Sequence, residues 1–379
     1  MKSFIYLQAT FIPNDFELPI PGNVPFFKFL IVFSFLLHII FVNMTLSGAV
    51  FAVYHEIKGI ITKQKVYDRL AFQLATQTSI FKSIAVVLGV APLLLISVIY
   101  TQFFYPSTIL IGKAWLSIIL LLTIAFLLLY AYKFTWVRLK RNKGIHLMFG
   151  LSGTLILLFI PLIFIVNIVS MLYPEMWSGA NGFFHSLFYY PQIWQRYAHF
   201  ILTSFAVMGI FMYLWNRRQL SKLHASLNEN DSSAQSETAA TTEKENKEAP
   251  IYNAGKRFGI SMTFWTTILQ FIFGSLVLVS LETDKMLLYM GGDSFLTGLL
   301  IASIAVTMLL TFFLYLVMRT DAKRWVNLAA TSFLIVVALM GWMLHEVREL
   351  YVEPHREANP PTVMQEEAPT LNALNKEEK

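Results

Sequence analysis

Two histidines lie inside stretches that are apolar enough to cross a lipid bilayer. His38 occurs in FLLHIIFVNMTLSGAVFAVY and His199 in RYAHFILTSFAVMGIF. A titratable ring inside a membrane costs free energy unless a partner binds it. A neutral imidazole presents one unprotonated nitrogen to a metal while its other N–H donates a hydrogen bond, so both rings are candidate ligands of haem b iron. The alternative for each ring is a structural histidine bonded to a neighbouring hydroxyl or carbonyl.

Four other polar residues are candidates to hold the same cofactor. Arg196 and Arg348 flank histidines on the outer rim of the membrane, where a guanidinium can pair with a haem propionate. His345, at the outer end of the last apolar run, could ligate a shallow haem or mark the interface. Lys113 begins the third run and either extends to the outer surface or serves as a ligand or propionate partner. The remaining histidines are given no role: His55, His146, His185, His224 and His355.

The chain contains no cysteine, which excludes several kinds of redox centre. Iron–sulfur clusters, thiolate ligands, covalently attached c-type haem and disulfides all need cysteine. Any redox centre must therefore be held noncovalently by His, Met, Lys or carboxylate side chains. The 15 methionines are best explained as apolar filler, so composition does not identify an axial Met.

The elements that carry these residues are long apolar helices. The 379-residue chain is 56% hydrophobic and 14% charged and contains 33 Phe, more apolar surface than a water-soluble domain can cover. Continuous apolar runs in lipid must be helices, and each run here can span ~30 Å at ~1.5 Å per residue. The predicted fold is an all-α integral membrane protein with about eight spans: Phe27–Tyr54, Ser79–Thr101, Thr108–Phe134, Leu147–Tyr173, Ile193–Trp215, Phe258–Leu281, Phe295–Met318 and Val326–Leu344.

The distribution of basic residues predicts the orientation of the helices. Lys and Arg cluster in the loops after the first, third, fifth and seventh runs, while the other loops carry almost none. By the positive-inside rule both termini lie outside, and His38 and His199 both lie in the outer half of the membrane. The net charge of +6 is thus explained by topology and indicates no nucleic-acid partner.

Composition divides the chain into five segments. Residues 1–26 lack the pattern of a cleaved signal peptide and are interpreted as an external lead-in. A five-helix front bundle, 27–220, and a three-helix back bundle, 254–352, flank a polar segment, 221–253, that is expected to be a disordered cytoplasmic linker. The external tail, 353–379, is also expected to be disordered and is either solvated or a docking strap.

The predicted spans contain no Asp or Glu. The nearest carboxylates, Glu56, Glu175, Glu282 and Glu346, are expected at or beyond helix ends. Carriers driven by protons or cations usually place an acidic residue near the midplane of the membrane. This absence argues against a solute transporter.

Several stretches resemble subunit I of the cytochrome bd quinol oxidases. They are FLLHIIFVNMTLSGAVFAVYHEI, LGVAPLLLISVIYTQFFY, LYPEMWSGANGFFHSLFYYPQIWQRYAHFILTSFAVMGIFMYLW, AGKRFGISMTFWTTILQFIFGSLVLVSLETD and RTDAKRWVNLAATSFLIVVALMGWMLHEVREL. The resemblance covers about Phe27 to Tyr351 and rests on the order of these stretches and on two histidines in register. It implies that His38 ligates a high-spin b haem and His199 a low-spin b haem.

The chain departs from that family at its oxygen-reducing site. Lys113 falls close to the place of a helix-three glutamate, and the apolar residues Ala338 to Met340 replace the helix-eight glutamate. Leu300 occupies the place of the Met that completes the low-spin haem, and the external quinol loop is cut to ETDKMLLYMGGDS. Reducing oxygen to water needs an open iron, buried acid–base groups and a proton route. We therefore expect no oxygen reduction.

The expected function is electron transfer by a membrane cytochrome b subunit with one or two haems b. Such an oxidoreductase component would be a multi-pass protein of the bacterial cytoplasmic (inner) membrane, associated with other membrane subunits. It would carry electrons between membrane quinone or quinol and an external (periplasmic) c-type or multihaem cytochrome. A haem-poor structural anchor of a larger respiratory complex is the alternative, and a solute transporter is a third hypothesis.

Overall fold

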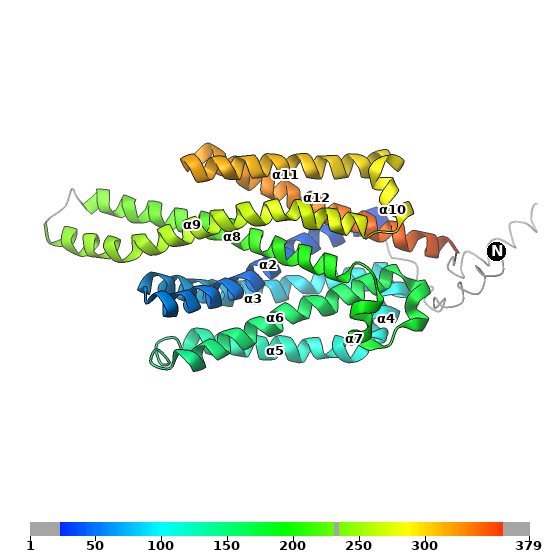
Figure 1. Cartoon of the computed structure of the whole chain (residues 1–379), viewed down its shortest axis with the longest axis horizontal. Coiled ribbons are helices and arrows are strands. Elements are labelled where there is room, and N and C mark those ends of the chain that lie inside the picture. The colour runs from blue at the N-terminus through cyan, green and yellow to red at the C-terminus, as the bar shows by residue number, and fades with distance from the viewer. Residues whose placement is uncertain (1–22, 231–234, 359–379) are drawn as a thin grey trace, which may run out of the picture.

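The computed structural model describes residues 23–230 and 235–358, which are helical throughout apart from short turns and contain no strand (Figure 1). The elements are α2 (Val24–Thr62), α3 (Lys65–Ile99), α4 (Thr101–Leu110), α5 (Gly112–Phe134), α6 (Lys143–Leu172), η2 (Pro174–Gly179), α7 (Gly182–Tyr189), α8 (Ile193–Asn230), α9 (Gln235–Val279), α10 (Thr283–Leu287), η3 (Leu288–Gly292), α11 (Ser294–Thr320) and α12 (Lys323–Ala358).

Eight of the described helices are long and apolar enough to cross a membrane. They are α2, α3, α5, α6, α8, α9, α11 and α12. Each predicted run coincides with one of them, and several helices continue well past the run at one end. The prediction of an all-α, multi-span membrane protein is confirmed.

Local sequence signals set the ends of two spanning helices. Asn23 precedes α2, and its side-chain oxygen accepts a hydrogen bond from the backbone N–H of Phe26 at 3.3 Å. Asp293 begins α11 in the same way, accepting from the N–H of Leu296 at 2.8 Å. Both side chains satisfy a backbone donor that the first turn of a helix leaves free. Lys63 and Asp321 then end α2 and α11 in the left-handed conformation, with φ of 56° and 50°.

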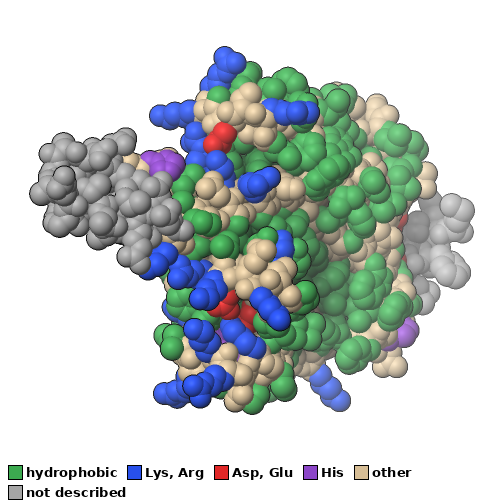
Figure 2. Space-filling model, turned by 60° about the vertical axis from the view of Figure 1, so that its left-hand side comes forward, with side chains coloured by type: hydrophobic (Ala, Val, Ile, Leu, Met, Phe, Trp, Pro, Cys, Tyr) green, Lys and Arg blue, Asp and Glu red, His purple; other side chains and the backbone are tan. Residues whose placement is uncertain are grey.

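One end of the bundle is strongly basic. The α2–α3, α5–α6 and α11–α12 connections all lie at this end (Figure 1). Figure 2 shows Lys and Arg side chains gathered there and hydrophobic side chains over the flanks. We refer to this end as the basic end, which the positive-inside rule assigns to the cytoplasm, and to the opposite end as the outer end.

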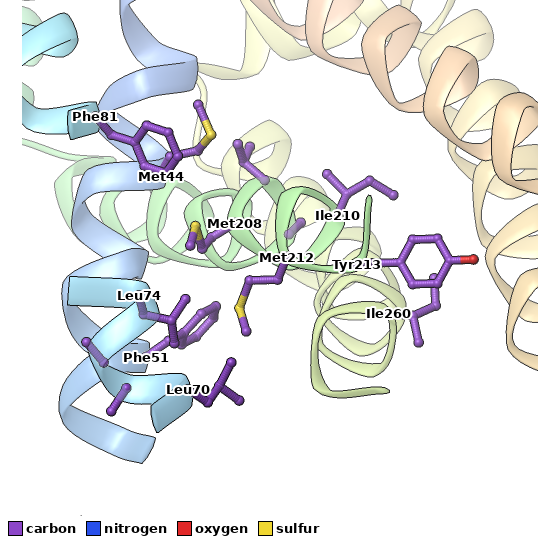
Figure 3. Close-up of a cluster of buried hydrophobic side chains, with 14 of the residues drawn as sticks. Met44, Phe51, Leu70, Leu74, Phe81, Met208, Ile210, Met212, Tyr213 and Ile260 are labelled. Carbon is purple, nitrogen blue, oxygen red and sulfur yellow. The ribbon is translucent and has the colours of Figure 1, made fainter. Parts of the chain in front are cut away.

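The core near the basic end joins the front and back groups of helices. Met44 and Phe51 of α2 pack with Met208 and Met212 of α8 and with Ile260 of α9 (Figure 3). The backbones of α8 and α9 approach closely, since a Cβ added at Gly209 would lie 2.8 Å from the carbonyl oxygen of Gly259. Glycine at this crossing permits the contact, so the two groups of helices share one core.

Two segments differ from their sequence-based predictions. The segment 221–253 was expected to lack regular structure, but α8 continues to Asn230 and α9 begins at Gln235. Ala, Glu and Lys favour helix, and Leu223 and Ile251, near the two ends of this segment, are buried. α12 extends to Ala358, so the first residues of the predicted tail are helical as well. Residues 1–22 of the lead-in and 359–379 of the tail lie outside the described residues.

The expectation that Glu56 and Glu346 lie at or beyond helix ends is wrong. α2 continues through Glu56 to Thr62, and α12 continues through Glu346 to Ala358. Glu56 is fully buried, at 0% exposure. Packing against neighbouring helices therefore extends both helices beyond the apolar runs that hydropathy identifies.

Candidate functional site

Two hydrogen-bonded residues set α2 and α8 in register near the outer half of the bundle. The hydroxyl of Ser204 donates to the side-chain oxygen of Asn43 at 2.8 Å, and both residues are buried. His38 precedes Asn43 by five residues, and His199 precedes Ser204 by five. α2 and α8 run in the same direction (Figure 1). The two rings, each five residues outward of the Asn43–Ser204 hydrogen bond, therefore lie at about the same depth.

Helix geometry turns the two rings away from the α2–α8 contact. Five residues at about 100° each rotate a side chain by about 140° from the contact face. His38 accordingly packs against α3 at Ala85 and Gly89, while His199 packs against α9 at Gly274. The two predicted ligands therefore lie at about the same depth but face different helices: His38 faces α3, and His199 faces α9.

The ring of His38 is held in one tautomer. Its Nδ1 lies 2.9 Å from the carbonyl oxygen of Ala85, which can only accept, so Nδ1 carries the proton. A neutral ring in an apolar site then has its lone pair on Nε2. Gly89, one turn further along α3, packs on the ring, and a Cβ there would lie 2.7 Å from Cε1.

The surroundings of His199 contain two buried polar atoms without a partner. These are Nδ1 of His199 and the side-chain oxygen of Gln270. The Gln270 amide nitrogen donates to the backbone oxygen of His199 at 3.1 Å and to Thr203 Oγ1 at 2.7 Å. Gly274, the next turn of α9, leaves room beside the ring, since a Cβ there would lie 3.7 Å from Cε1.

Arg196 and Arg348 bring two positive charges to the outer half of the bundle. Arg348 is buried, at 9% exposure, and its guanidinium lies 5.0 Å from the ring centre of Tyr100. The half-buried Arg196 donates twice to the side-chain oxygen of Gln192, at 2.9 and 2.6 Å. The two guanidiniums are close enough to repel each other. Neither forms an ion pair with a carboxylate among residues 23–225 and 247–356, whose side chains the structure describes.

The nearest carboxylate to Arg348 in the sequence is already neutralised. Glu349 accepts hydrogen bonds from Lys28 and from the hydroxyl of Tyr100, and Arg356 lies 3.7 Å away. Burial raises the pKa of the Tyr100 hydroxyl, so Tyr100 remains a donor at neutral pH. Glu349 is therefore not free to compensate the charge of Arg348.

A buried network fixes Arg196 in place. Gln192, which immediately precedes α8, has a left-handed φ of 69° and is 2% exposed. Its amide donates to the hydroxyls of Tyr173 and Tyr351, the latter at 3.2 Å, and Tyr351 also accepts from the backbone N–H of Glu282 at 3.0 Å. Burial, followed by the hydrogen bond with Tyr351, raises the pKa of the Tyr173 hydroxyl. Four chain segments thus meet at Gln192, which explains how its backbone strain is maintained.

His345 lines a cavity of about 580 Å³ between the start of α2 and the outer part of α12. This outer cavity is bounded by Pro25 and Lys28 of α2 and by residues of α12, Trp342 and Glu346 among them. His345 is 5% exposed, and its Nδ1 has no hydrogen-bond partner. Arg348 follows His345 by three residues on the same helix.

Lys113 does not join the other candidate residues. It is exposed in the first turn of α5 at the outer end. This placement agrees with a side chain that extends to the outer surface.

Sequence reasoning missed a buried charge cluster at the basic end. His146, which was given no role, places Nδ1 2.7 Å from Glu56 and Nε2 2.8 Å from the carbonyl oxygen of Tyr132. Lys143 bridges Glu56 at 3.0 Å and Asp68 at 2.6 Å. Glu56 and His146 are 90 residues apart, so no local pattern could have paired them. Gln192, Gln270 and Glu349 escaped notice for the same reason.

Comparison of the chain with protein-family models and with curated proteins finds no match. Function must therefore be inferred from the site. No group of three or more His, Asp or Glu side chains in the described chain is placed to hold a bare metal ion. The site provides single imidazoles in apolar surroundings. It also provides two guanidiniums that form no ion pair with the described carboxylates.

Proposed function

We propose that this chain is a membrane cytochrome b subunit that carries electrons between the quinone pool and a redox partner outside the membrane. The observation that carries the proposal is a repeated spacing of histidine and arginine. Arg196 precedes His199 by three residues on α8, and Arg348 follows His345 by three on α12. Residues three apart on a helix lie on one face.

The charge of these arginines favours an anionic ligand. A guanidinium inside a membrane bundle is costly unless an anion or a set of acceptors compensates it. Arg348 has a buried Nε without a partner, and Arg196 has only the neutral oxygen of Gln192. A haem b carries two propionates, so two guanidiniums would suit the propionates of one haem, or one propionate on each of two haems.

The histidines suit the iron of such a group. His38 has Nδ1–H directed at Ala85, so its Nε2 lone pair is free for a ligand bond. His199 lies against Gly274 with an unpartnered Nδ1. Haem b, when bound, supplies a reversible one-electron couple. The chain's own residues would orient the imidazoles and pair with the propionates, and the surrounding Phe, Leu and Ile side chains would exclude water.

Partners follow from this function and from the topology. Quinone is a membrane-soluble carrier of electrons, and an external c-type or multihaem cytochrome is a suitable partner at the outer end, where both histidines lie. The multi-pass architecture suits the bacterial cytoplasmic membrane and association with other membrane subunits. The resemblance to cytochrome bd subunit I supports the same conclusion.

One observation favours the second candidate, a structural subunit with little or no haem. Leu300, which falls where the resembling family has an axial Met, packs into an apolar cluster and offers no ligand atom. A haem held by His199 would then take its sixth ligand from elsewhere or remain five-coordinate. Haem stoichiometry distinguishes the two candidates.

The Arg–His pairs give a direct test of the proposal. The full-length chain and the double variant R196Q/R348Q are purified in detergent, and haem b is measured as its pyridine adduct. We expect the double variant to lose at least half of the haem that the parent protein retains. If both proteins retain the same amount of haem, Arg196 and Arg348 do not bind the propionates. If the parent protein contains no haem, the second candidate, a structural subunit, is favoured.

A further inference from the structure

A groove of about 560 Å³ runs between α9 and α11, two helices that lie side by side (Figure 1). Its walls are Phe264 and Phe271 of α9 and Ile304, Met308, Thr311, Phe312 and Tyr315 of α11. The α11 wall is open to the surroundings, since the side chain of Met308 is 60% exposed and that of Phe312 is 53% exposed. We refer to this feature as the α9–α11 groove. Because both helices are membrane spans, the groove opens to lipid.

The α9–α11 groove is apolar and is about as long as one leaflet of a membrane. The hydroxyl of Thr311 donates to the carbonyl oxygen of Thr307 at 2.8 Å, so it is satisfied within the helix. From Ile304 to Tyr315 is eleven residues, or about 16 Å at ~1.5 Å per residue, which is half of a ~30 Å hydrocarbon layer. Tyr315 lies near the end of α11 at Thr320, so the groove lies in the half of the membrane next to the basic end. One lipid chain of that leaflet matches its length and its polarity.

An arginine from each helix lies where the groove meets the basic end. Arg319 follows Tyr315 by four residues on α11, and Arg257 precedes Phe264 by seven on α9. Both spacings keep the arginine on the same face of its helix as the groove wall. Nε of Arg319 donates to the hydroxyl of Tyr315 at 3.1 Å, and its guanidinium lies 5.3 Å from the centre of that ring. Tyr315 therefore holds Arg319 at the mouth of the groove.

A printed ion pair places the two arginines at the same level. Lys256 of α9 contacts Asp321, the residue after α11, at 2.8 Å. Arg257 is the neighbour of Lys256, and Arg319 lies two residues before Asp321. Asp321 is also 3.4 Å from Arg217, so its charge is already shared by two cations. The exposed Arg257 and Arg319 form no ion pair with any carboxylate whose side chain the structure describes.

The combination of an apolar groove and two unpaired guanidiniums selects the class of ligand. A soluble anion such as phosphate would pair with the guanidiniums but would leave the groove unused. A zwitterionic lipid fills the groove but brings its own positive charge to the arginines. An anionic phospholipid supplies both a chain for the groove and a phosphate, which guanidinium binds with two hydrogen bonds. Basic pockets between spanning helices on the cytoplasmic side recognise lipids of this class.

We infer that the α9–α11 groove binds an anionic phospholipid of the cytoplasmic leaflet. Its phosphate pairs with Arg257 and Arg319, and one of its acyl chains lies along the groove between Phe264 and Ile304. A volume of about 560 Å³ is within the range of small-molecule sites. This site is separate from the histidines of the proposed function and does not depend on haem.

Photolabelling of the full-length protein locates the lipid without any variant. The protein in phosphatidylcholine nanodiscs receives a phosphatidylglycerol that carries a diazirine on one acyl chain, and labelled peptides are identified by mass spectrometry. We expect label on residues 264–271 or 304–315, and we expect unlabelled phosphatidylglycerol but not inorganic phosphate to prevent it. A phosphatidylcholine with the same diazirine should label these residues far less. Label confined to other segments, or equal label from both lipids, overturns the inference.

The double variant R257Q/R319Q tests recognition of the headgroup. We expect it to weaken binding of phosphatidylglycerol, titrated by native mass spectrometry, by about tenfold or more, because each Arg near an anionic lipid contributes roughly fivefold. The matched control is R138Q/R141Q, which removes the same charge from exposed arginines between α5 and α6. Equal binding by the two double variants would show a general effect of charge and would overturn the inference.

The variant M308W tests the path of the acyl chain. An indole at Met308 fills the groove, so we expect M308W to lose the label on α9 and α11. L309W is the matched control, because Leu309 is the next residue, is 51% exposed and lies outside the groove lining. Equal labelling of M308W and L309W overturns the inference. Label that disappears when another membrane subunit co-purifies with the chain assigns the groove to that subunit and overturns it as well.

Discussion

Gly89 of α3 packs directly against the imidazole of His38. A Cβ at this position would lie 2.7 Å from Cε1 of the ring and 3.1 Å from Nδ1. Real atoms do not approach this closely, so any larger residue must displace the histidine. The ring of His38 is therefore positioned by α3, through the carbonyl of Ala85 on one side and the missing side chain of Gly89 on the other.

The variant G89A tests this packing. We expect the added methyl group to push the ring away from the Ala85 carbonyl. This overpacking should lower the free energy of unfolding by about 1–3 kcal/mol. It should also reduce the amount of haem bound at His38. Thermal unfolding and reduced-minus-oxidised spectra in detergent measure the two effects. G298A is the control, because a Cβ at Gly298 meets nothing within 4 Å. A G89A protein indistinguishable from G298A would contradict the packing described here.

Gln270 gives a prediction for the other histidine. Its amide connects α9 to the His199 backbone oxygen and to Thr203. We expect Q270L to remove both bonds and shift the absorption band or midpoint potential of the haem at His199, while the signal from His38 remains. A redox titration of the purified variant provides the measurement. A shift of the His38 signal alone would reverse the assignment.

The buried cluster at the basic end predicts an effect on stability. Glu56 is fully buried and contacts His146 at 2.7 Å and Lys143 at 3.0 Å. We expect H146A to destabilise the protein by about 1–3 kcal/mol, since the buried Glu56 loses one hydrogen-bond partner and keeps only Lys143. The exposed H185A is the control, and thermal unfolding in detergent is the readout. Equal stability of the two variants would show that Lys143 alone satisfies Glu56 and that His146 adds nothing.

Asp321 predicts an acid-sensitive contribution to stability. Burial acts to raise the pKa of this carboxyl, but Lys256 at 2.8 Å, Tyr213 and Arg217 outweigh burial and lower it below 3.8. A carboxyl whose pKa is lower in the folded state stabilises the protein above its unfolded pKa. This contribution is lost as pH falls from about 4 through the folded pKa.

The variant D321N should therefore lower stability at pH 7 and flatten its dependence on pH below about 4. Because the Asp321 side chain is 42% exposed, we expect an effect below about 1 kcal/mol. Unfolding temperatures of D321N and the parent at pH 7 and pH 3.5 provide the comparison. If the difference in unfolding temperature between the parent and D321N is larger at pH 3.5 than at pH 7, the predicted direction of the pKa shift is wrong.

Hydropathy and charge predict the eight spans, their alternation and the depth of His38 and His199, because each depends only on position along a helix. The faces on which these residues lie depend on how helices rotate against one another. Gly89 opposite His38 and Gly274 opposite His199 follow from packing between distant segments. No composition rule could place them.

The segment 221–253 shows a second limit of sequence reasoning. Its polar composition predicts a linker, yet Leu223 and Ile251, near its two ends, are buried. Glu56 shows the same limit, because a carboxylate beyond the apolar run is buried by α6, which carries Lys143 and His146. In both cases contacts between helices override the local pattern.

Haem content of the purified full-length chain and of H38A and H199A, measured as the pyridine adduct together with reduced-minus-oxidised spectra, tests the central claim most directly. We expect haem b in the parent protein, loss of one spectral component in H38A and of a different component in H199A, and full retention in H185A. A parent protein without haem b, or single variants that keep the parent's haem and spectrum, would contradict the assignment of His38 and His199 as haem ligands.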